Sequence, residues 1–277
     1  MPEPLRLPFA AGIALQRYLR AEEGLVNCHE EGCSHWYVDL SLPTDQPSEW
    51  SPSRVASLRR AAALLGCRPI LHGNFRAPLA SEIPEVREGV WRYLKQELFL
   101  AAELNAPLIL HGGGMVEPRP TRTARLDALR RALAMTERLR ARGEQYGVEV
   151  WLENLSHYPR HRPFSYVFTT VGDFRLAIRE APALRFVLDV GHAHVNQKAS
   201  VALLDAFTDR IRALSFSDND ARSDAHLGLG RGTLPVAEIV SLVRRKGWHG
   251  LVVFETRGSP GRHGVATLAA LACEQNA

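Results

Sequence analysis

Residues 185–194 read RFVLDVGHAH and contain the pattern on which the fold depends. A short apolar run ends at Asp189, and a glycine and two histidines follow within five residues. Short apolar runs bounded by polar or glycine-containing turns are typical of strands that are covered on both faces. In barrels of parallel strands the reactive residues lie at the carboxyl ends of the strands. Asp189 therefore marks a position where a functional site is expected.

The same pattern recurs along the chain and predicts the fold class. Eight apolar runs occupy residues 5–13, 36–42, 69–72, 107–111, 148–153, 185–189, 211–217 and 251–255. Helical patterns lie between or after them, at 15–23, 84–104, 125–146, 171–181, 203–210, 236–246 and 264–273. Eight strands that alternate with helices predict an α/β fold of the (β/α)8 TIM barrel type rather than an open sheet. No low-complexity linker interrupts residues 1–277, so we expect a single domain.

The composition excludes several classes of protein. Apolar residues make up 45% and charged residues 23%, which is ordinary globular usage and excludes a disordered chain or a coiled-coil rod. No run approaches the roughly 20 apolar residues that a membrane helix needs, so we expect a cytoplasmic protein with no membrane partner. Four cysteines are too few for a disulfide scaffold. A net charge of +4 without a clustered basic stripe does not by itself indicate nucleic-acid binding.

Ligand-type side chains gather at the ends of the third to eighth predicted strands. They are His72, His111, Glu153, Asp189 with His192, Asp224 with His226, and Glu255. Burying several carboxylates and imidazoles in one funnel is costly unless cations neutralise them. Mixed histidine and carboxylate ligation suits Zn²⁺, Mn²⁺ or Fe²⁺ better than Ca²⁺ or Mg²⁺. We therefore predict one to three divalent metal ions per chain, with zinc or manganese favoured.

The order of these motifs resembles a known superfamily. Residues 72–114, HGNFRAPLASEIPEVREGVWRYLKQELFLAAELNAPLILHGGG, are followed by ENL at 153–155, LDVGHAH at 188–194, DAHLGLGRGTL at 224–234 and ETRG at 255–258. In this order and at these separations they are similar to the xylose isomerase-like TIM barrels. That superfamily includes sugar phosphate isomerases and epimerases as well as endonuclease IV, an apurinic-site endonuclease.

The resemblance implies a ligand set. One metal would be held by His72, His111 and Glu153. Glu153 would bridge to a second metal that is held by Asp189 and Glu255, and a third would be held by His192, Asp224 and His226. The catalytic residues on this reading are Glu153, Glu255 and His192.

Two departures from the superfamily bear on function. Its members usually place a histidine ligand of the second metal on the seventh strand, where this chain has Ser215. The central site is then left with three protein ligands, unless water, Ser217 or Asp218 completes it. The DNA-repair members also carry a distinctive stretch after the sixth strand and extended loops that grip duplex DNA, which residues 186–200 do not show. Duplex DNA is therefore not the expected partner, and the sequence leaves the oligomeric state open.

Arginines in loops on the reactive side indicate a small anionic substrate. The predicted substrate-binding residues are Arg160, Arg162, Arg231 and Arg262. Their guanidinium groups can bind phosphate or carboxylate through two parallel hydrogen bonds.

Three functions remain open at this stage. With two or three metals, the funnel favours metal-assisted hydrolysis or cleavage of a phosphorylated or otherwise anionic substrate, as a phosphoesterase does. With a single metal at Glu153, Asp189 and Glu255, it favours isomerisation or epimerisation of a sugar or sugar phosphate. If Ser215 abolishes metal binding, the chain is a non-catalytic barrel that binds a metabolite. We expect the hydrolase, with the isomerase or epimerase as the alternative.

Overall fold

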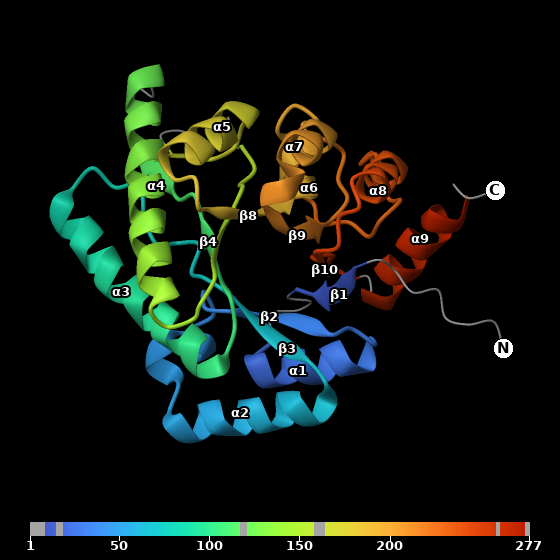
Figure 1. Ribbon diagram of the computed structural model, residues 1–277, viewed down its shortest axis with the longest axis horizontal. Helices are drawn as coiled ribbons and strands as arrows, with labels where there is room; N and C mark the ends of the chain where they lie inside the picture. The colour runs from blue at the N-terminus through green and yellow to red at the C-terminus, as the bar shows by residue number, and fades with distance from the viewer. Residues whose placement is uncertain (1–8, 15–18, 117–120, 158–163, 259–260, 275–277) are drawn as a thin grey trace.

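The computed structural model shows a closed barrel of parallel strands with helices around it, which confirms the predicted TIM barrel (Figure 1). It describes residues 9–14, 19–116, 121–157, 164–258 and 261–274. The strands pair in the circular order β1-β10-β9-β8-β6-β4-β3-β2. Their bounds are β1 Ala10–Ile13, β2 His35–Asp39, β3 Arg68–His72, β4 Leu108–His111, β6 Val150–Glu153, β8 Arg185–Asp189, β9 Ile211–Phe216 and β10 Leu251–Phe254.

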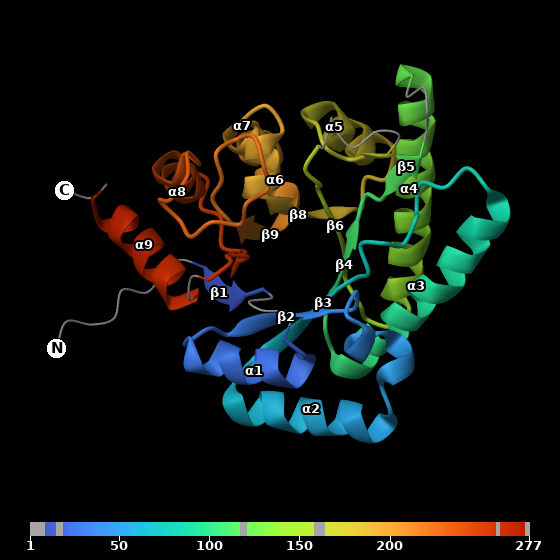
Figure 2. The same cartoon turned by 180° about the vertical axis from the view of Figure 1, so that it is seen from behind.

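The helices lie on the outside of this barrel, as the two opposite views in Figures 1 and 2 show. They are α1 Ala21–Glu30, α2 Pro52–Leu65, α3 Pro84–Leu104, α4 Arg122–Glu144, α5 Val171–Glu180, α6 Val190–Val195, α7 Ser200–Phe207, α8 Val236–Arg245 and α9 Gly261–Glu274. Among the described residues, short 3₁₀ helices occupy Pro43–Asp45, Pro47–Glu49 and Thr208–Arg210. Within the described ranges no helix is both long enough and apolar enough to cross a membrane.

The first βα unit differs from the sequence prediction. The helix expected at 15–23 instead begins at Ala21 and ends at Glu30. Its buried positions are Ala21, Leu25 and Cys28, a helical spacing that faces the barrel. The Trp36 indole N–H donates a hydrogen bond to the Ala21 carbonyl, at 3.1 Å, and so fixes the start of the helix against β2. This long-range contact is not visible in the local sequence pattern.

A small two-stranded sheet was also not predicted. Strands β5 (Gly114–Val116) and β7 (Phe164–Tyr166) pair antiparallel, outside the barrel. Each strand has only three residues, and the two lie far apart in sequence, so neither shows a period that a sequence pattern could detect. The sheet joins the connection after β4 to the connection after β6, both at the carboxyl end of the barrel.

The interior of the barrel follows the alternation of side chains along each strand. A buried cluster fills its centre: Ala14, Tyr37, Ile70, Ile109, Trp151, Val187, Ala213, Leu251 and Val253. The intervening side chains face outward and pack against the helices in a second, larger cluster. Because side chains repeat every two residues on one face, the residues two positions after the central layer also point inward. Those positions include His72, Glu153 and Asp189.

A glycine allows close packing directly after β4. A Cβ added to Gly112 would lie 2.5 Å from the Phe168 Cβ and 2.8 Å from the Val167 carbonyl oxygen, so Gly112→Ala forces the backbone apart. We expect this substitution to lower the free energy of unfolding by about 1–3 kcal/mol in urea denaturation. Gly89→Ala in α3 is the matched control. Its Cβ meets nothing nearer than 3.9 Å, and alanine favours helix, so it should raise stability by up to about 1 kcal/mol. Equal effects at the two glycines would contradict this account.

Candidate metal centre

The carboxyl ends of three neighbouring strands bring the first group of ligand-type residues together. His72 ends β3, His111 ends β4 and Glu153 ends β6. The Glu153 Oε2 atom lies 3.6 Å from His72 Nε2 and 3.8 Å from His111 Nε2. One ligand atom from each residue lies within 4.8 Å of the other two, which is close enough to share a metal ion. This is the first set that the family resemblance implies.

Two further groups continue from the first across the mouth of the barrel. Glu153, Asp189 and His192 form the second group, and His192, Asp224 and His226 form the third. The Asp224 Oδ2 atom lies 3.2 Å from both His192 Nε2 and His226 Nε2. Because Glu153 and His192 each belong to two groups, the three groups are continuous.

Glu255 stands at the edge of this array. It directly follows β10, and its Oε2 atom lies 4.0 Å from the His226 Nδ1 atom. The family resemblance joins it to Glu153 and Asp189, whereas the three-residue group in the structure contains His192 in its place. Ser215 pairs in register with Asp189, and its hydroxyl is buried beside this central group.

Backbone carbonyls fix the orientation of two of the imidazoles. The Nδ1 atom of His192 is 2.8 Å from the Asn154 carbonyl oxygen, and the Nδ1 atom of His226 is 2.8 Å from the Glu255 carbonyl oxygen. A carbonyl only accepts, so Nδ1 carries a proton in both rings, and Nε2 of the neutral imidazole is left with a lone pair that can bind a metal ion. Both Nε2 atoms face Asp224. A hydrogen bond from Nδ1 to a backbone carbonyl is typical of histidines that bind metal through Nε2.

The donor atoms fit a divalent cation. Buried atoms without a hydrogen-bond partner within the described residues include His72 Nδ1, His111 Nδ1, Glu153 Oε2, Asp189 Oδ2 and Glu255 Oε1. A charged group that is left unpaired in the interior costs several kcal/mol of stability. A cation bound to it removes this cost. Imidazole nitrogen together with carboxylate oxygen is the donor set of zinc and manganese sites.

The pKa values show how strongly these charges act on one another. Burial raises the pKa of both Glu153 and Asp189, and in Asp189 the neighbouring carboxylates of Glu255 and Glu153 raise it further. Burial alone would lower the pKa of His72, but the Glu153 carboxylate outweighs it and raises the value to about 9. The pKa of His111 is lowered by burial and then by His72. Without a cation, protons would have to balance this cluster.

The sequence prediction missed three residues that support the site. Tyr37, in β2, stacks on His72 with ring centroids 5.1 Å apart, and its buried hydroxyl has no hydrogen-bond partner within the described residues. Burial, followed by the carboxylates of Glu153 and Glu255, raises the pKa of Tyr37, so its phenol stays protonated and can donate a hydrogen bond. In the sequence, an aromatic residue inside an apolar run is interpreted as a core residue. Only the structure shows that the Tyr37 side chain points into the barrel and contacts His72.

Asn154 and Glu97 are the other two. The Asn154 amide bridges to the Asp189 backbone, accepting from its N–H at 2.9 Å and donating to its carbonyl at 3.0 Å. Glu97 is fully buried in α3 and accepts a hydrogen bond from the Asn74 backbone N–H at 2.9 Å, which holds the turn after His72. The ENL motif at 153–155 was a signal for Asn154, but nothing in the helix pattern marked Glu97.

Two of the predicted substrate-binding arginines, Arg231 and Arg262, lie within the described residues. Arg231 is exposed in the loop after β9. Arg262 lies at the start of α9, where its guanidinium is 3.7 Å from the Glu31 carboxylate and 71% exposed. Arg160 and Arg162 lie outside the described residues.

A family model described as "Xylose isomerase-like TIM barrel" matches residues 28–273. The chain belongs to this family. Among curated relatives of the xylose isomerase-like barrel, the fructoselysine 3-epimerase of Escherichia coli O157:H7 is 27% identical over 114 residues. That match spans 40% of this chain and 40% of the relative.

Solved structures share the whole xylose isomerase-like barrel. A D-tagatose 3-epimerase-like protein superposes with a TM-score of 0.80 at 16% identity, over 97% of this chain and 100% of the other. The TTHB071 protein of Thermus thermophilus, soaked with ZnCl2, superposes with a TM-score of 0.73 at 26% identity, over 96% and 99% of the two chains. These comparisons do not support the phosphoester hydrolysis that the sequence analysis favoured, and they agree better with its isomerase or epimerase alternative.

The metal content of variants tests whether Glu153 is a ligand in two of the three groups. Because Glu153 belongs to two of the three groups, Glu153→Ala should strip the metal from both. Asp224→Asn, the matched control, alters only the group with His192 and His226 and should leave metal at His72 and His111. Elemental analysis of dialysed protein would measure this difference. Full metal content in Glu153→Ala would show that the residue is not a ligand.

The dependence of stability on pH tests whether burial raises the pKa of the Glu97 carboxyl. Burial raises the pKa of Glu97 to about 7, above its ordinary value of 4.5. The folded state therefore holds this proton more tightly than the unfolded chain does, and the resulting stability is complete below pH 4.5 and lost as pH rises through 7. Glu97→Gln cannot lose a proton, so from pH 5 to 8 it should gain about 1–3 kcal/mol relative to wild type. Urea denaturation across this range would measure the gain.

The control for this experiment is Glu85→Gln, at an exposed position of the same helix. Its stability curve should run parallel to that of the wild type. A Glu97→Gln curve that also runs parallel would mean that Glu97 does not titrate in this range.

Proposed function

We propose that this chain is a divalent-metal-dependent isomerase or epimerase that acts on a small ketose sugar or ketose derivative. The observation that supports it is the pair of glutamates at the mouth of the barrel. Glu153 ends β6 and Glu255 follows β10, and in the barrel these strands are separated by β8 and β9. Each glutamate has a buried carboxylate oxygen without a hydrogen-bond partner within the described residues.

Two carboxyl groups that approach from different sides suit epimerisation. One carboxylate takes the proton from the carbon next to the ketone, and the electron pair of the broken C–H bond moves into the carbonyl to give an enediolate. The other carboxyl group returns a proton to the opposite face of the same carbon, which inverts it. If the proton returns to the neighbouring carbon, the result is isomerisation. Both outcomes balance without any further reactant.

The metal would be held by Glu153, Asp189 and His192, with Glu255 at its edge. A divalent cation there supplies Lewis acidity, which makes the proton next to a ketone easier to remove. The chain's own groups orient the substrate. The Tyr37 phenol and the Ser215 and Ser217 hydroxyls are buried without hydrogen-bond partners within the described residues, so they are free to bind sugar hydroxyls.

The comparisons support this proposal over hydrolysis. The curated relative that matches part of the chain is named a fructoselysine 3-epimerase, and the barrel superposes on a D-tagatose 3-epimerase-like protein. Both names describe inversion at carbon 3 of a ketose or ketose derivative. A substrate of that class has the ketone and the adjacent C–H that the two glutamates require.

Proton exchange tests the reaction directly. Metal-loaded protein incubated with a panel of ketoses in D2O should incorporate deuterium at one carbon and form the epimer or the isomer, both of which NMR detects. Glu153→Gln and Glu255→Gln should each lower turnover by at least about 100-fold, since each removes one proton-transfer group. Glu149→Gln, at the amino end of the barrel, should leave turnover unchanged. Release of phosphate from phosphodiesters without sugar exchange would overturn the proposal in favour of the hydrolase.

A further inference from the structure

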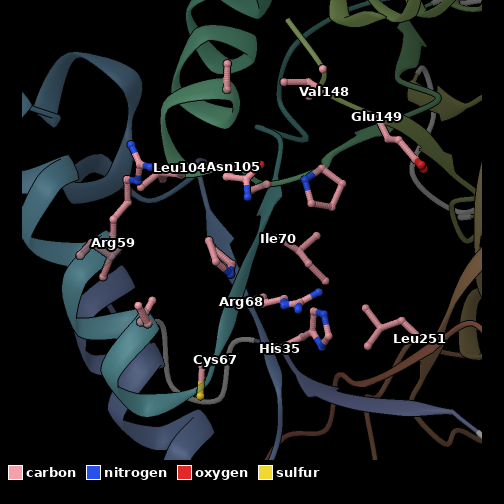
Figure 3. A pocket seen from close by; sticks show the side chains of 18 of the residues that line it. His35, Arg59, Cys67, Arg68, Ile70, Leu104, Asn105, Val148, Glu149 and Leu251 are labelled. Carbon is pink, nitrogen blue, oxygen red and sulfur yellow. The ribbon is translucent and has the colours of Figure 1, made fainter.

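A large cavity outside the metal centre lies at the opposite end of the barrel. It has a volume of about 940 Å³ and lies at the amino ends of the strands. Its walls come from β2, β3 and β10 and from the segments that enter β3, β4 and β6. Figure 3 shows Arg59 at one end of it, beside Leu104 and Asn105, and Arg68, His35, Ile70 and Leu251 at the other.

The alternation along the strands explains why polar side chains line this end. In β3 the inward series is Arg68, Ile70 and His72, and in β2 it is His35, Tyr37 and Asp39. Both series begin with a basic residue at the amino end and reach the metal centre at the carboxyl end. The central apolar layer separates the two mouths. The cavity is therefore a distinct site, not an extension of the metal centre.

The charges around the cavity are mainly positive. Arg59, Arg68 and Arg212 line it, together with the single carboxylate of Glu149. That carboxylate is already engaged, since its Oε2 atom accepts from the Trp151 indole N–H at 2.7 Å and lies 3.4 Å from Arg212 Nε. The guanidinium groups of Arg59 and Arg68 have no hydrogen-bond or ion-pair partner within the described residues. Two guanidinium groups are thus available to an anion.

The pKa values of neighbouring groups agree with a net positive charge at this end of the barrel. His35 pairs in register with Arg68, and burial followed by the charge of Arg68 lowers the pKa of His35 to about 4. The imidazole is therefore neutral at pH 7 and serves as a hydrogen-bonding group. Arg185, at the start of β8, has its pKa lowered first by burial and then by Arg210 and Arg212. A concave surface with low-dielectric walls concentrates such a potential.

The remaining lining is apolar. Ile70, Trp151 and Leu251, which belong to the central layer of the barrel, line the cavity together with Pro69 and Pro107. Small-molecule sites commonly combine an apolar surface of this kind with a few convergent polar groups. The two features together fit a ligand that has an anionic head and an apolar body.

We propose that the amino-terminal mouth of the barrel binds a small organic phosphate, with the phosphate on Arg68 and a compact apolar body against Ile70 and Leu251. Arginine forks match phosphate oxygens in geometry and charge. Arg59, at the other end of the cavity, adds to the positive potential without contacting the phosphate. This site is independent of the reaction at the carboxyl-terminal mouth.

Phenyl phosphate is a suitable probe because it has a dianionic head and a flat apolar body. Calorimetric titration should show saturable binding to wild type, weaker binding of inorganic phosphate and no binding of phenol. Arg68→Gln should weaken phenyl phosphate binding about tenfold, as expected for one charge-assisted contact. Glu149→Gln should strengthen it about threefold, because it removes the one negative charge at the rim.

Arg231→Gln is the matched control, because it removes an exposed arginine at the opposite mouth. It should leave binding unchanged, and so should EDTA, which removes metal from the other site. Arg59→Gln provides a second variant if Arg68→Gln does not fold, and it should weaken binding about twofold through the lower potential. The proposal is overturned if phenyl phosphate does not bind at millimolar concentration. It is equally overturned if binding is lost with EDTA or in Arg231→Gln but kept in Arg68→Gln.

Discussion

Two buried carboxylates and a third that is partly buried lie together at one end of a closed barrel, and the rest of the site depends on how their charge is balanced. Glu153, Asp189 and Glu255 are each held by a strand end that cannot move without breaking barrel hydrogen bonds. Their repulsion cannot be relieved by turning toward solvent, because Glu153 and Asp189 are almost fully buried. A divalent cation held between them would relieve it, and the cost of burying these carboxylates would then contribute to the affinity for metal.

The groups around the carboxylates are held by contacts that leave few degrees of freedom. Asn154 locks the backbone of Asp189, and its own carbonyl fixes the ring of His192. The Glu255 carbonyl does the same for His226. The ligands are therefore oriented before any metal binds, and this preorganisation is what precise proton transfer requires.

The two ends of the barrel have opposite electrostatic character, and the apolar centre lies between them. The carboxyl-terminal mouth carries the acidic cluster, and the amino-terminal mouth carries Arg59, Arg68 and Arg212 with one carboxylate. The layer that contains Ile70 and Trp151 keeps these ends apart. A small neutral sugar and an organic anion would thus be bound at different ends of one molecule, each by the charge that suits it.

The sequence by itself determined the barrel and most of the candidate ligands. Eight strands that alternate with helices predict a closed parallel sheet, and polar residues at the strand ends then meet at one mouth, so His72, His111, Glu153 and Asp189 could be chosen without coordinates. Only the tertiary structure decided which ligands share a group, because His192 replaces Glu255 beside Glu153 and Asp189 through the short helix that begins after β8. It also revealed Tyr37, Glu97 and the arginine-lined cavity, and it moved the first helix to Ala21. Each of these depends on contacts between residues far apart in the sequence, which local periodicity does not contain.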